Sequence, residues 1–128
     1  MIVKIGEREI EMHYSLRMYI LYENRLGESV DFTKLNNYTY TLNLFYCAVL
    51  SSMQYHKMEL DLEFDEFMDW TDTEEGMSTI PEFLAWYFTN LKLQEEILGN
   101  ATEKLADKAT EKNNKKSDKK GKTSKNVK

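Results

Sequence analysis

Carboxylates are the side chains of this 128-residue sequence whose number and spacing come closest to a reactive site. Nine of them fall within residues 58–75, and six are close enough to be placed around a divalent ion: Asp61, Glu63, Asp65, Glu66, Asp69 and Asp72. A calcium-binding loop needs a glycine and a fixed order of ligands, and this segment has neither. We therefore interpret it as a solvated acidic face rather than as a metal site.

The two histidines and the single cysteine show no catalytic or metal-binding pattern. His13 and His56 lack a second His or Cys at ligand spacing, so we expect them to be structural residues at a hairpin edge and a helix end. Cys47 has no partner for an internal disulfide, which indicates a reducing compartment and a role as a small apolar side chain. Phosphate-binding glycine loops and nucleophile-elbow serines are missing. The sequence predicts a non-enzyme without cofactor or metal.

The elements that position these side chains are arranged around one apolar run, Leu42–Leu50. It predicts the middle of a buried helix over about residues 39–56. The expected inner stripe consists of Leu42, Phe45, Val49 and Met53. Crossing a bilayer takes about 20 apolar residues, so we expect a core helix and no membrane association.

The N-terminal residues 1–12 alternate between apolar and polar side chains, which predicts a β-hairpin resting on the helices. A loop from Gly6 to Glu9 would place Ile5 opposite Ile10. A two-residue type II′ turn at Gly6-Glu7 is the alternative register. The same N-terminus lacks the long apolar core and the cleavage site of a secretory signal, which favours a cytosolic location.

Shorter helices are expected on either side of the apolar run. Ser15 is the expected N-cap of a helix that ends at Gly27. Its inner stripe is expected to contain Leu16, Tyr19, Ile20 and Leu26, with Glu23 on the same stripe. Phe32 and Leu35 are expected to fill the core from a connecting turn, and a short helix is expected from about Glu63 to Trp70.

The last predicted helix begins at the capping box Thr79-Ile80-Pro81-Glu82 and runs from there to Leu98, with Gly99 as its end. Its apolar side chains occupy more than one face, so we predict that part of this surface contacts a partner. The candidate contact residues are Leu84, Trp86, Tyr87, Phe88 and Leu91. Packing against the apolar run and the hairpin is the alternative for each of them.

Charge divides the chain into an acidic body and a basic tail. Residues 1–100 contain 18 Asp and Glu against 7 Lys and Arg, a net charge of −11. Residues 101–128 contain 10 Lys against 4 acids, a net charge of +6, and no aromatic residue. We expect a mainly α fold of the α+β class, with a hairpin packed on about four helices (residues 1–99) and a disordered Lys-rich tail (residues 100–128). Specific recognition of nucleic acid is not expected, because the tail offers no stacking side chain.

A longer pattern extends over residues 1–98. The opening VKIGEREIEMHYSLRMYILYENRLGES combines a hairpin with S-L-R, an aromatic residue and Glu23 before L-G-E-S. An apolar helix, the acidic segment LEFDEFMDW, a closing helix and a Lys-rich end follow in that order. This order resembles the small tail assembly chaperones of long-tailed, siphovirus-like bacteriophages. The chain departs from that family in the heavy aromatic load of FLAWYF.

The resemblance implies a protein of the infected host cytoplasm that is absent from the mature virion. It implies binding to the helices of the tape-measure protein and recruitment of tail-tube subunits. Such phages often make a longer form by ribosomal frameshifting, and Lys115-Lys116 or Lys119-Lys120-Gly121 would fit adenine-rich slippery codons. The excess aromatic surface makes a homo-oligomer a further hypothesis. The alternative function is a small phage or bacterial regulatory module that binds a host protein or nucleic acid.

Overall fold

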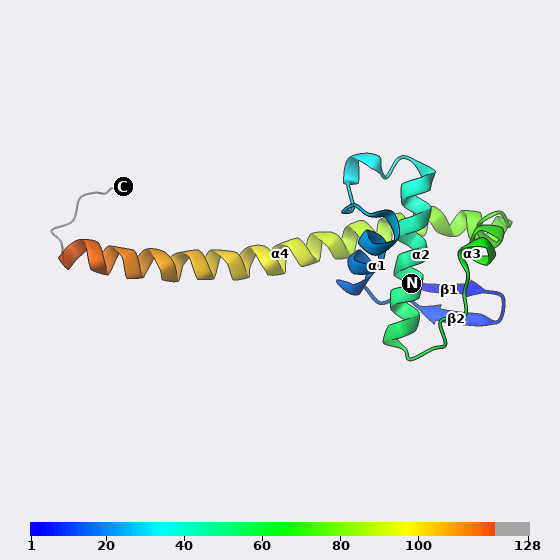
Figure 1. Cartoon of the computed structure of the whole chain (residues 1–128), viewed down its shortest axis with the longest axis horizontal. Helices are drawn as coiled ribbons and strands as arrows, with labels where there is room; N and C mark the ends of the chain where they lie inside the picture. Colours follow the sequence, from blue (N-terminus) through cyan, green and yellow to red (C-terminus); the bar gives the residue numbers. More distant parts are fainter. Residues whose placement is uncertain (120–128) are drawn as a thin grey trace. The chain divides into compact units, whose positions relative to one another are not determined.

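The chain forms a two-stranded antiparallel hairpin followed by four α-helices in the part that the structure describes (Figure 1). This computed structural model describes residues 1–119, without the side chains of 102–104 and 107–119. The elements are β1 (Ile2–Ile5), β2 (Arg8–Glu11), α1 (Arg17–Leu26), a 3-10 turn (Phe32–Lys34), α2 (Tyr38–Tyr55), α3 (Phe64–Thr71) and α4 (Glu74–Lys119). The predicted fold class is confirmed. No helix within residues 1–119 is long and apolar enough to span a membrane.

Packing divides the chain into two compact units, Met1–Phe88 and Thr89–Lys128. The first unit contains the hairpin, α1, α2, α3 and the start of α4. It also contains every buried apolar residue of the described part except Leu91. The domain boundary predicted after residue 99 stays a prediction. Predicted disorder of the tail falls partly on residues 120–128, which lie outside the described residues.

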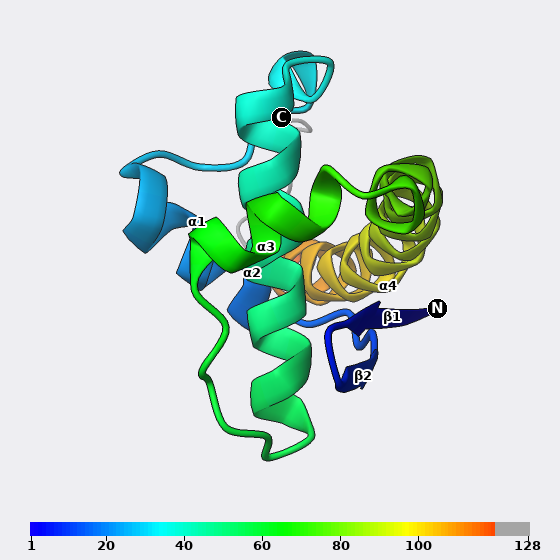
Figure 2. The same cartoon turned by 90° about the vertical axis from the view of Figure 1, so that its right-hand side faces the viewer.

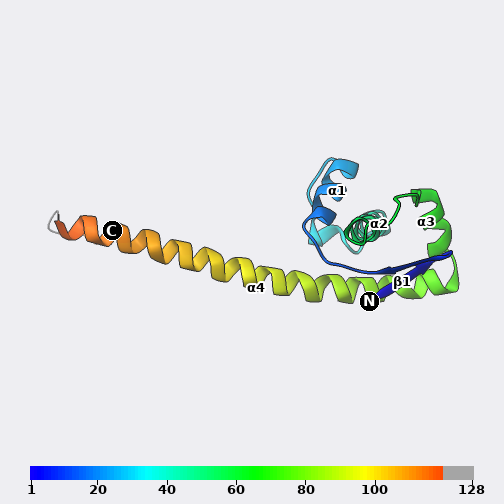
Figure 3. The ribbon, with the colours of Figure 1, turned by 90° about the horizontal axis from the view of Figure 1, so that it is seen from below.

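Helix α2 is the centre of the first unit. Viewed along its axis, it is enclosed by α1, α3 and the hairpin (Figure 3). Eleven of its 18 residues are buried. The Phe45 ring stacks on Phe83 of α4, with 4.4 Å between ring centroids, and meets Phe67 of α3 edge-on at 5.2 Å. The predicted helix over residues 39–56 is therefore confirmed, including three fully buried members of its stripe: Phe45, Val49 and Met53.

The hairpin adopts the alternative of the two registers. Ile5 pairs with Arg8 and Val3 pairs with Ile10, which leaves Gly6-Glu7 as a two-residue turn. Gly6 has a φ of +63°, the conformation that the first position of a type II′ turn requires and that glycine adopts without strain. The predicted pairing of Ile5 with Ile10 was therefore wrong. The side-chain faces are unchanged, because the two registers differ by an even number of residues.

Helix α1 buries a different stripe from the predicted one. Met18 and Tyr22 are buried, whereas Leu16 and Ile20 are more than half exposed and Glu23 is exposed. Apolar residues occur on both faces of this helix, so their periodicity alone does not predict which face is buried.

Arg25 ties the end of α1 to two other helices. Its guanidinium carbon lies 4.1 Å from the centroid of the Phe64 ring of α3 and 5.1 Å from that of Tyr46 in α2. Its Nε also donates a hydrogen bond to Asn43 of α2. These contacts join the end of α1, whose Met18 and Tyr22 are buried, to α2 and α3. As predicted, Gly27 ends the helix in the left-handed conformation, with a φ of 74°.

Helix α4 begins at Glu74, five residues before the predicted capping box. The actual cap is Thr73, whose Oγ1 accepts a hydrogen bond of 3.0 Å from the Gly76 N–H. The Thr79 hydroxyl instead donates to the Glu75 carbonyl within the helix, at 2.7 Å. Pro81 therefore lies inside α4 rather than in its first turn.

A close approach between α3 and α4 accounts for the glycine at position 76. A Cβ built on Gly76 would lie 1.9 Å from the carbonyl oxygen of Trp70 and 2.9 Å from the Cα of Thr71. Both of these atoms belong to the backbone, so only glycine fits. Figure 2 shows the end of α3 leading directly into α4 at this place. The predicted short helix from Glu63 to Trp70 is confirmed by α3 within one residue at each end.

The other end of α4 also differs from the prediction. The helix continues through Gly99 and Asn100 to Lys119. A glycine stops a helix by adopting a left-handed φ, and among the described glycines only Gly6 and Gly27 have a positive φ. The predicted end at Gly99 was therefore wrong.

Candidate partner interface

The five residues predicted to contact a partner differ in exposure. Tyr87 is completely buried, and Leu91 is only 9% exposed. Leu84 and Trp86 are half-buried, and Phe88 is 43% exposed. In this conformation Phe88 has the largest exposed fraction of the five, whereas Tyr87 has none. The partner-binding role of the set stays a prediction.

Tyrosine hydroxyls explain why the buried aromatic residues of α4 are needed for packing. The Tyr19 hydroxyl donates to the Tyr87 hydroxyl at 3.2 Å, and it is also hydrogen-bonded to the Tyr14 hydroxyl. The Trp86 ring meets the Tyr14 ring edge-on, with centroids 5.9 Å apart. A buried tyrosine needs a partner for its hydroxyl, and this cluster supplies one. Much of the aromatic load of α4 therefore holds the segment around α1 in place.

Four exposed apolar side chains occur in two pairs, one at the start of α1 and one between the 3-10 turn and α4, and we call the four together the exposed apolar surface: Leu16, Ile20, Phe32 and Phe88. Their exposed fractions are 59%, 57%, 50% and 43%. The Phe32 and Phe88 rings meet edge-on at 6.4 Å, while Leu16, the N-cap of α1, lies one turn before Ile20. Phe32 was predicted to fill the core, and this was wrong. Leu35, which was predicted to fill the core as well, does so with 7% exposure.

The turn that carries Phe32 is held by local polar contacts. Asp31 Oδ1 accepts hydrogen bonds from the backbone N–H and the hydroxyl of Thr33, at 2.9 and 2.7 Å. These bonds lower the pKa of Asp31 below its usual value. Lys34 donates to Glu28 at 3.0 Å. Phe32 is therefore presented to solvent on an ordered turn.

The acidic segment forms ion pairs with Arg8 of the hairpin. The Nη1 of Arg8 donates to Glu66 at 2.7 Å, and its Nε donates to Asp61 at 3.1 Å. The hydrogen bond to Glu66 raises the pKa of Arg8 above its usual value. The sequence indicated a solvated face, and nothing in the local pattern connects Arg8 with carboxylates more than 50 residues away.

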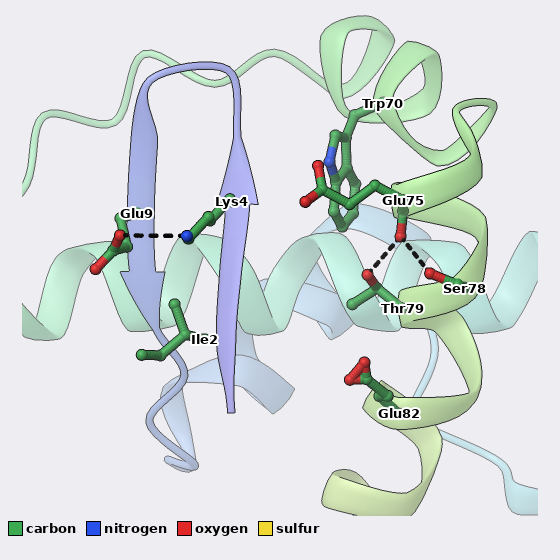
Figure 4. Close-up of a pocket in the computed structure, with 8 residues that line it drawn as sticks. All are labelled: Ile2, Lys4, Glu9, Trp70, Glu75, Ser78, Thr79 and Glu82. Atoms are coloured by element: carbon green, nitrogen blue, oxygen red, sulfur yellow. Dashed lines mark hydrogen bonds and ion pairs between the residues drawn. The ribbon is translucent and has the colours of Figure 1, made fainter.

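A groove in the first unit lies between the hairpin and the start of α4, as Figure 4 shows. Its volume is about 460 Å³, within the range of about 300–1,000 Å³ that is typical of ligand pockets. Its lining residues are Ile2, Lys4, Glu9, Trp70, Glu75, Ser78, Thr79 and Glu82. Lys4 and Glu9 form an exposed ion pair at 3.9 Å across the two strands. Sequence reasoning missed this groove, because its walls come from distant segments.

The remaining candidate reactive residues have structural contacts. The His56 Nε2 is hydrogen-bonded to the Glu11 carbonyl at 2.8 Å, and the His13 ring stacks on Tyr55 at 3.6 Å. Both histidines lie where predicted, His13 at the edge of the hairpin and His56 at the end of α2. Cys47 is buried, and this burial raises the pKa of its thiol to about 11. Among the side chains that the structure describes, no three His, Cys, Asp or Glu residues are arranged to hold a metal ion.

Comparison with protein-family models, with curated proteins and with solved structures finds no match to this chain.

Proposed function

We propose that this chain is a non-enzymatic assembly chaperone of a long-tailed bacteriophage, acting in the cytoplasm of the infected bacterium. It binds the tape-measure protein, helps recruit tail-tube subunits and leaves before the virion matures. The exposed apolar surface is the observation that carries the proposal. Its four large side chains lie on a body with a net charge of −11. Such a body keeps a complex soluble while its apolar side chains cover the apolar face of a helix.

The resemblance of residues 1–98 to tail assembly chaperones supplies the identity of the partner. Helix-in-groove recognition uses apolar anchors of the kind that Phe32 and Phe88 provide. Trp86 and Leu84, which are half-buried, extend the contact from α4. Tyr87 and Leu91 are buried and offer little surface to a partner, and the Tyr87 hydroxyl is hydrogen-bonded to that of Tyr19.

The experiment is a binding titration of the full chain with helical fragments of the tape-measure protein encoded by the same phage. Replacing Phe32 and Phe88 by serine should weaken binding by at least tenfold, because both rings are exposed and aromatic anchors dominate such interfaces. Tyr38→Ser is the matched control, since Tyr38 is 74% exposed outside this surface. Unchanged binding by the folded double variant would contradict the assignment of the surface. Absence of binding by the unaltered chain would contradict the function.

The second candidate is a regulatory module that binds a host protein or nucleic acid through the Lys-rich tail. The observation favouring it is the net charge of +6 on residues 101–128. Phosphate contacts by lysine release counterions, so such binding would weaken steeply with salt. A chain lacking residues 101–128 separates the two functions. Loss of all partner binding on this deletion, with normal binding by the Phe32 and Phe88 variants, would favour the regulatory module.

A further inference from the structure

The outer edge of β1 presents unpaired backbone groups. Met12 N–H donates to the Met1 carbonyl at 2.8 Å, which marks this pair as a hydrogen-bonded one. Hydrogen-bonded and non-hydrogen-bonded pairs alternate along an antiparallel ladder. Val3 therefore exchanges hydrogen bonds with Ile10, and the N–H and C=O groups of Ile2 and Lys4 point away from β2. Within the described residues, these four groups have no hydrogen-bond partner.

The groove defined above borders this edge. In Figure 4, β1 lies nearer to α4 than β2 does, so the free edge faces the start of α4. Both residues with outward backbone groups, Ile2 and Lys4, line the groove. A strand laid along β1 would therefore enter the groove and extend the sheet from two strands to three.

The opposite wall of the groove is acidic. Glu75 and Glu82 lie on α4, seven residues apart, which corresponds to roughly 10 Å along a helix. Neither carboxylate forms an ion pair within the described part of the chain. The other two charges of the groove, Lys4 and Glu9, neutralise each other. The groove therefore has a net charge of −2 and favours a cationic occupant.

A buried donor at the same groove lacks an acceptor. The Trp70 side chain lines the groove at 8% exposure, and its Nε1 has no hydrogen-bond partner among the described residues. A buried N–H without an acceptor is destabilising, so an occupant that supplies an acceptor is favoured at this position. Figure 4 shows the ring between α4 and the hairpin, where a backbone carbonyl or a side-chain oxygen of an occupant would approach it.

We propose that this groove binds an extended segment of a partner protein that carries Lys or Arg at alternate positions. The segment pairs with the edge of β1 through the backbone groups of Ile2 and Lys4. Alternate residues of a strand lie on one face, roughly 7 Å apart, so their long cationic side chains reach Glu75 and Glu82. This site goes beyond the proposed function, because it uses none of the four residues of the exposed apolar surface.

The test measures amide hydrogen exchange at Ile2 and Lys4 in the full chain, with a synthetic peptide of three Lys-Thr repeats as the probe. We expect exchange at both amides to slow by at least tenfold at saturating peptide. The control peptide has the same sequence and charge but carries N-methyl groups at alternate residues, which prevents strand pairing. Equal effects of the two peptides, or unchanged exchange at both amides, would overturn the proposal.

Paired substitutions test the acidic wall. Glu75→Gln with Glu82→Gln should weaken peptide binding by at least tenfold, whereas Glu95→Gln with Glu96→Gln, on α4 outside the groove, should leave it unchanged. Equal weakening of peptide binding by both pairs of substitutions would show non-specific electrostatic attraction and would contradict the proposal. Slow exchange at Ile2 and Lys4 in the full chain without peptide would also overturn it, because the chain would then occupy its own groove. Phe88→Ser should bind the peptide normally, so failure here is separate from failure of the proposed function.

Discussion

Arg8 connects parts of the chain that are 53 and 58 residues apart in sequence. Its side chain is 18% exposed, whereas its partners Asp61 and Glu66 are about half exposed. The contact therefore fixes the end of the hairpin against both α3 and the segment that precedes it. Partial exposure of the carboxylates moderates its strength through solvent screening.

Replacing Arg8 by alanine should lower the free energy of unfolding by about 1 kcal/mol, because two charge-assisted hydrogen-bond partners are lost. Urea unfolding measures this change. Lys4→Ala is the control: its pair with Glu9 is longer, at 3.9 Å, and more exposed, so its loss should cost at most about 0.5 kcal/mol. An Arg8 variant that is no less stable than the Lys4 variant would contradict this account.

Cys47 makes stability depend on alkaline pH. Burial raises the pKa of the folded thiol from 9.0 to about 11. Between these values the unfolded chain binds fewer protons than the folded chain, so the free energy of unfolding falls as pH rises. The loss attributable to Cys47 should be about 1 kcal/mol between about pH 8 and pH 10.

The measurement compares unfolding of the unaltered chain and of Cys47→Ala at both pH values. Burial also raises the pKa of Tyr22 and Tyr46, but both tyrosines are present in both proteins, so the difference isolates the thiol. The alanine variant should show the smaller alkaline loss. Identical pH slopes would show that the thiol ionises equally in both states.

At the level of single residues, the sequence predicts what depends on near neighbours. The burial of Cys47 follows from the apolar run around it, and Gly27 follows from its place after the α1 pattern. The ion pairs of Arg8 cannot be predicted in this way, because they depend on how the hairpin meets a distant segment. The unpartnered Trp70 N–H cannot be predicted from the sequence for the same reason.

Among the elements, the crossing of α3 and α4 has the strictest steric requirement. Gly76→Ala should destabilise the fold by about 2–4 kcal/mol, because its Cβ would overlap backbone atoms that cannot rotate away. Thermal unfolding measures the effect. Gly99→Ala is the matched control: its Cβ would meet nothing within 4 Å, and alanine favours a helix by up to about 1 kcal/mol over glycine. Similar effects of the two substitutions would refute the steric explanation.

The existence and type of each element could be predicted, whereas several ends and faces could not. Helix α2 is specified by burial on all sides, and α3 by its helical spacing of apolar residues. Thr79-Ile80-Pro81-Glu82 satisfies the capping rule, yet Thr73 caps α4 because the helix must begin next to Trp70. The two hairpin registers have equal local support, since both bury the same apolar face.

The candidate interface shows the same limit. Sequence alone identifies an excess of aromatic residues on α4, but it cannot distinguish Tyr87, which pairs with Tyr19, from Phe88, which reaches solvent. That distinction depends on where α1 lies. The groove between β1 and α4 likewise exists only once the elements are assembled.

For the molecule as a whole, the core lies almost entirely within Met1–Phe88. A chain ending at Asn100 should therefore unfold cooperatively with a free energy within about 1 kcal/mol of the full chain. Calorimetry measures this. A chain ending at Glu82, which loses the buried rings of Phe83 and Tyr87, should fail to fold. Loss of folding in the chain ending at Asn100 would show that the tail stabilises the body.

The burial of Trp70 gives the protein a natural optical reporter. Its indole contacts the Phe45 and Phe67 rings, with centroids 5.9 and 5.8 Å away, and only 8% of the residue is exposed. Separation of α3 from α4 would admit water to this ring and shift its fluorescence to longer wavelength. Trp86, half-buried beside Tyr14, gives a second signal. With Trp86 replaced by Phe, the chain's own fluorescence follows this single helix crossing without an added label.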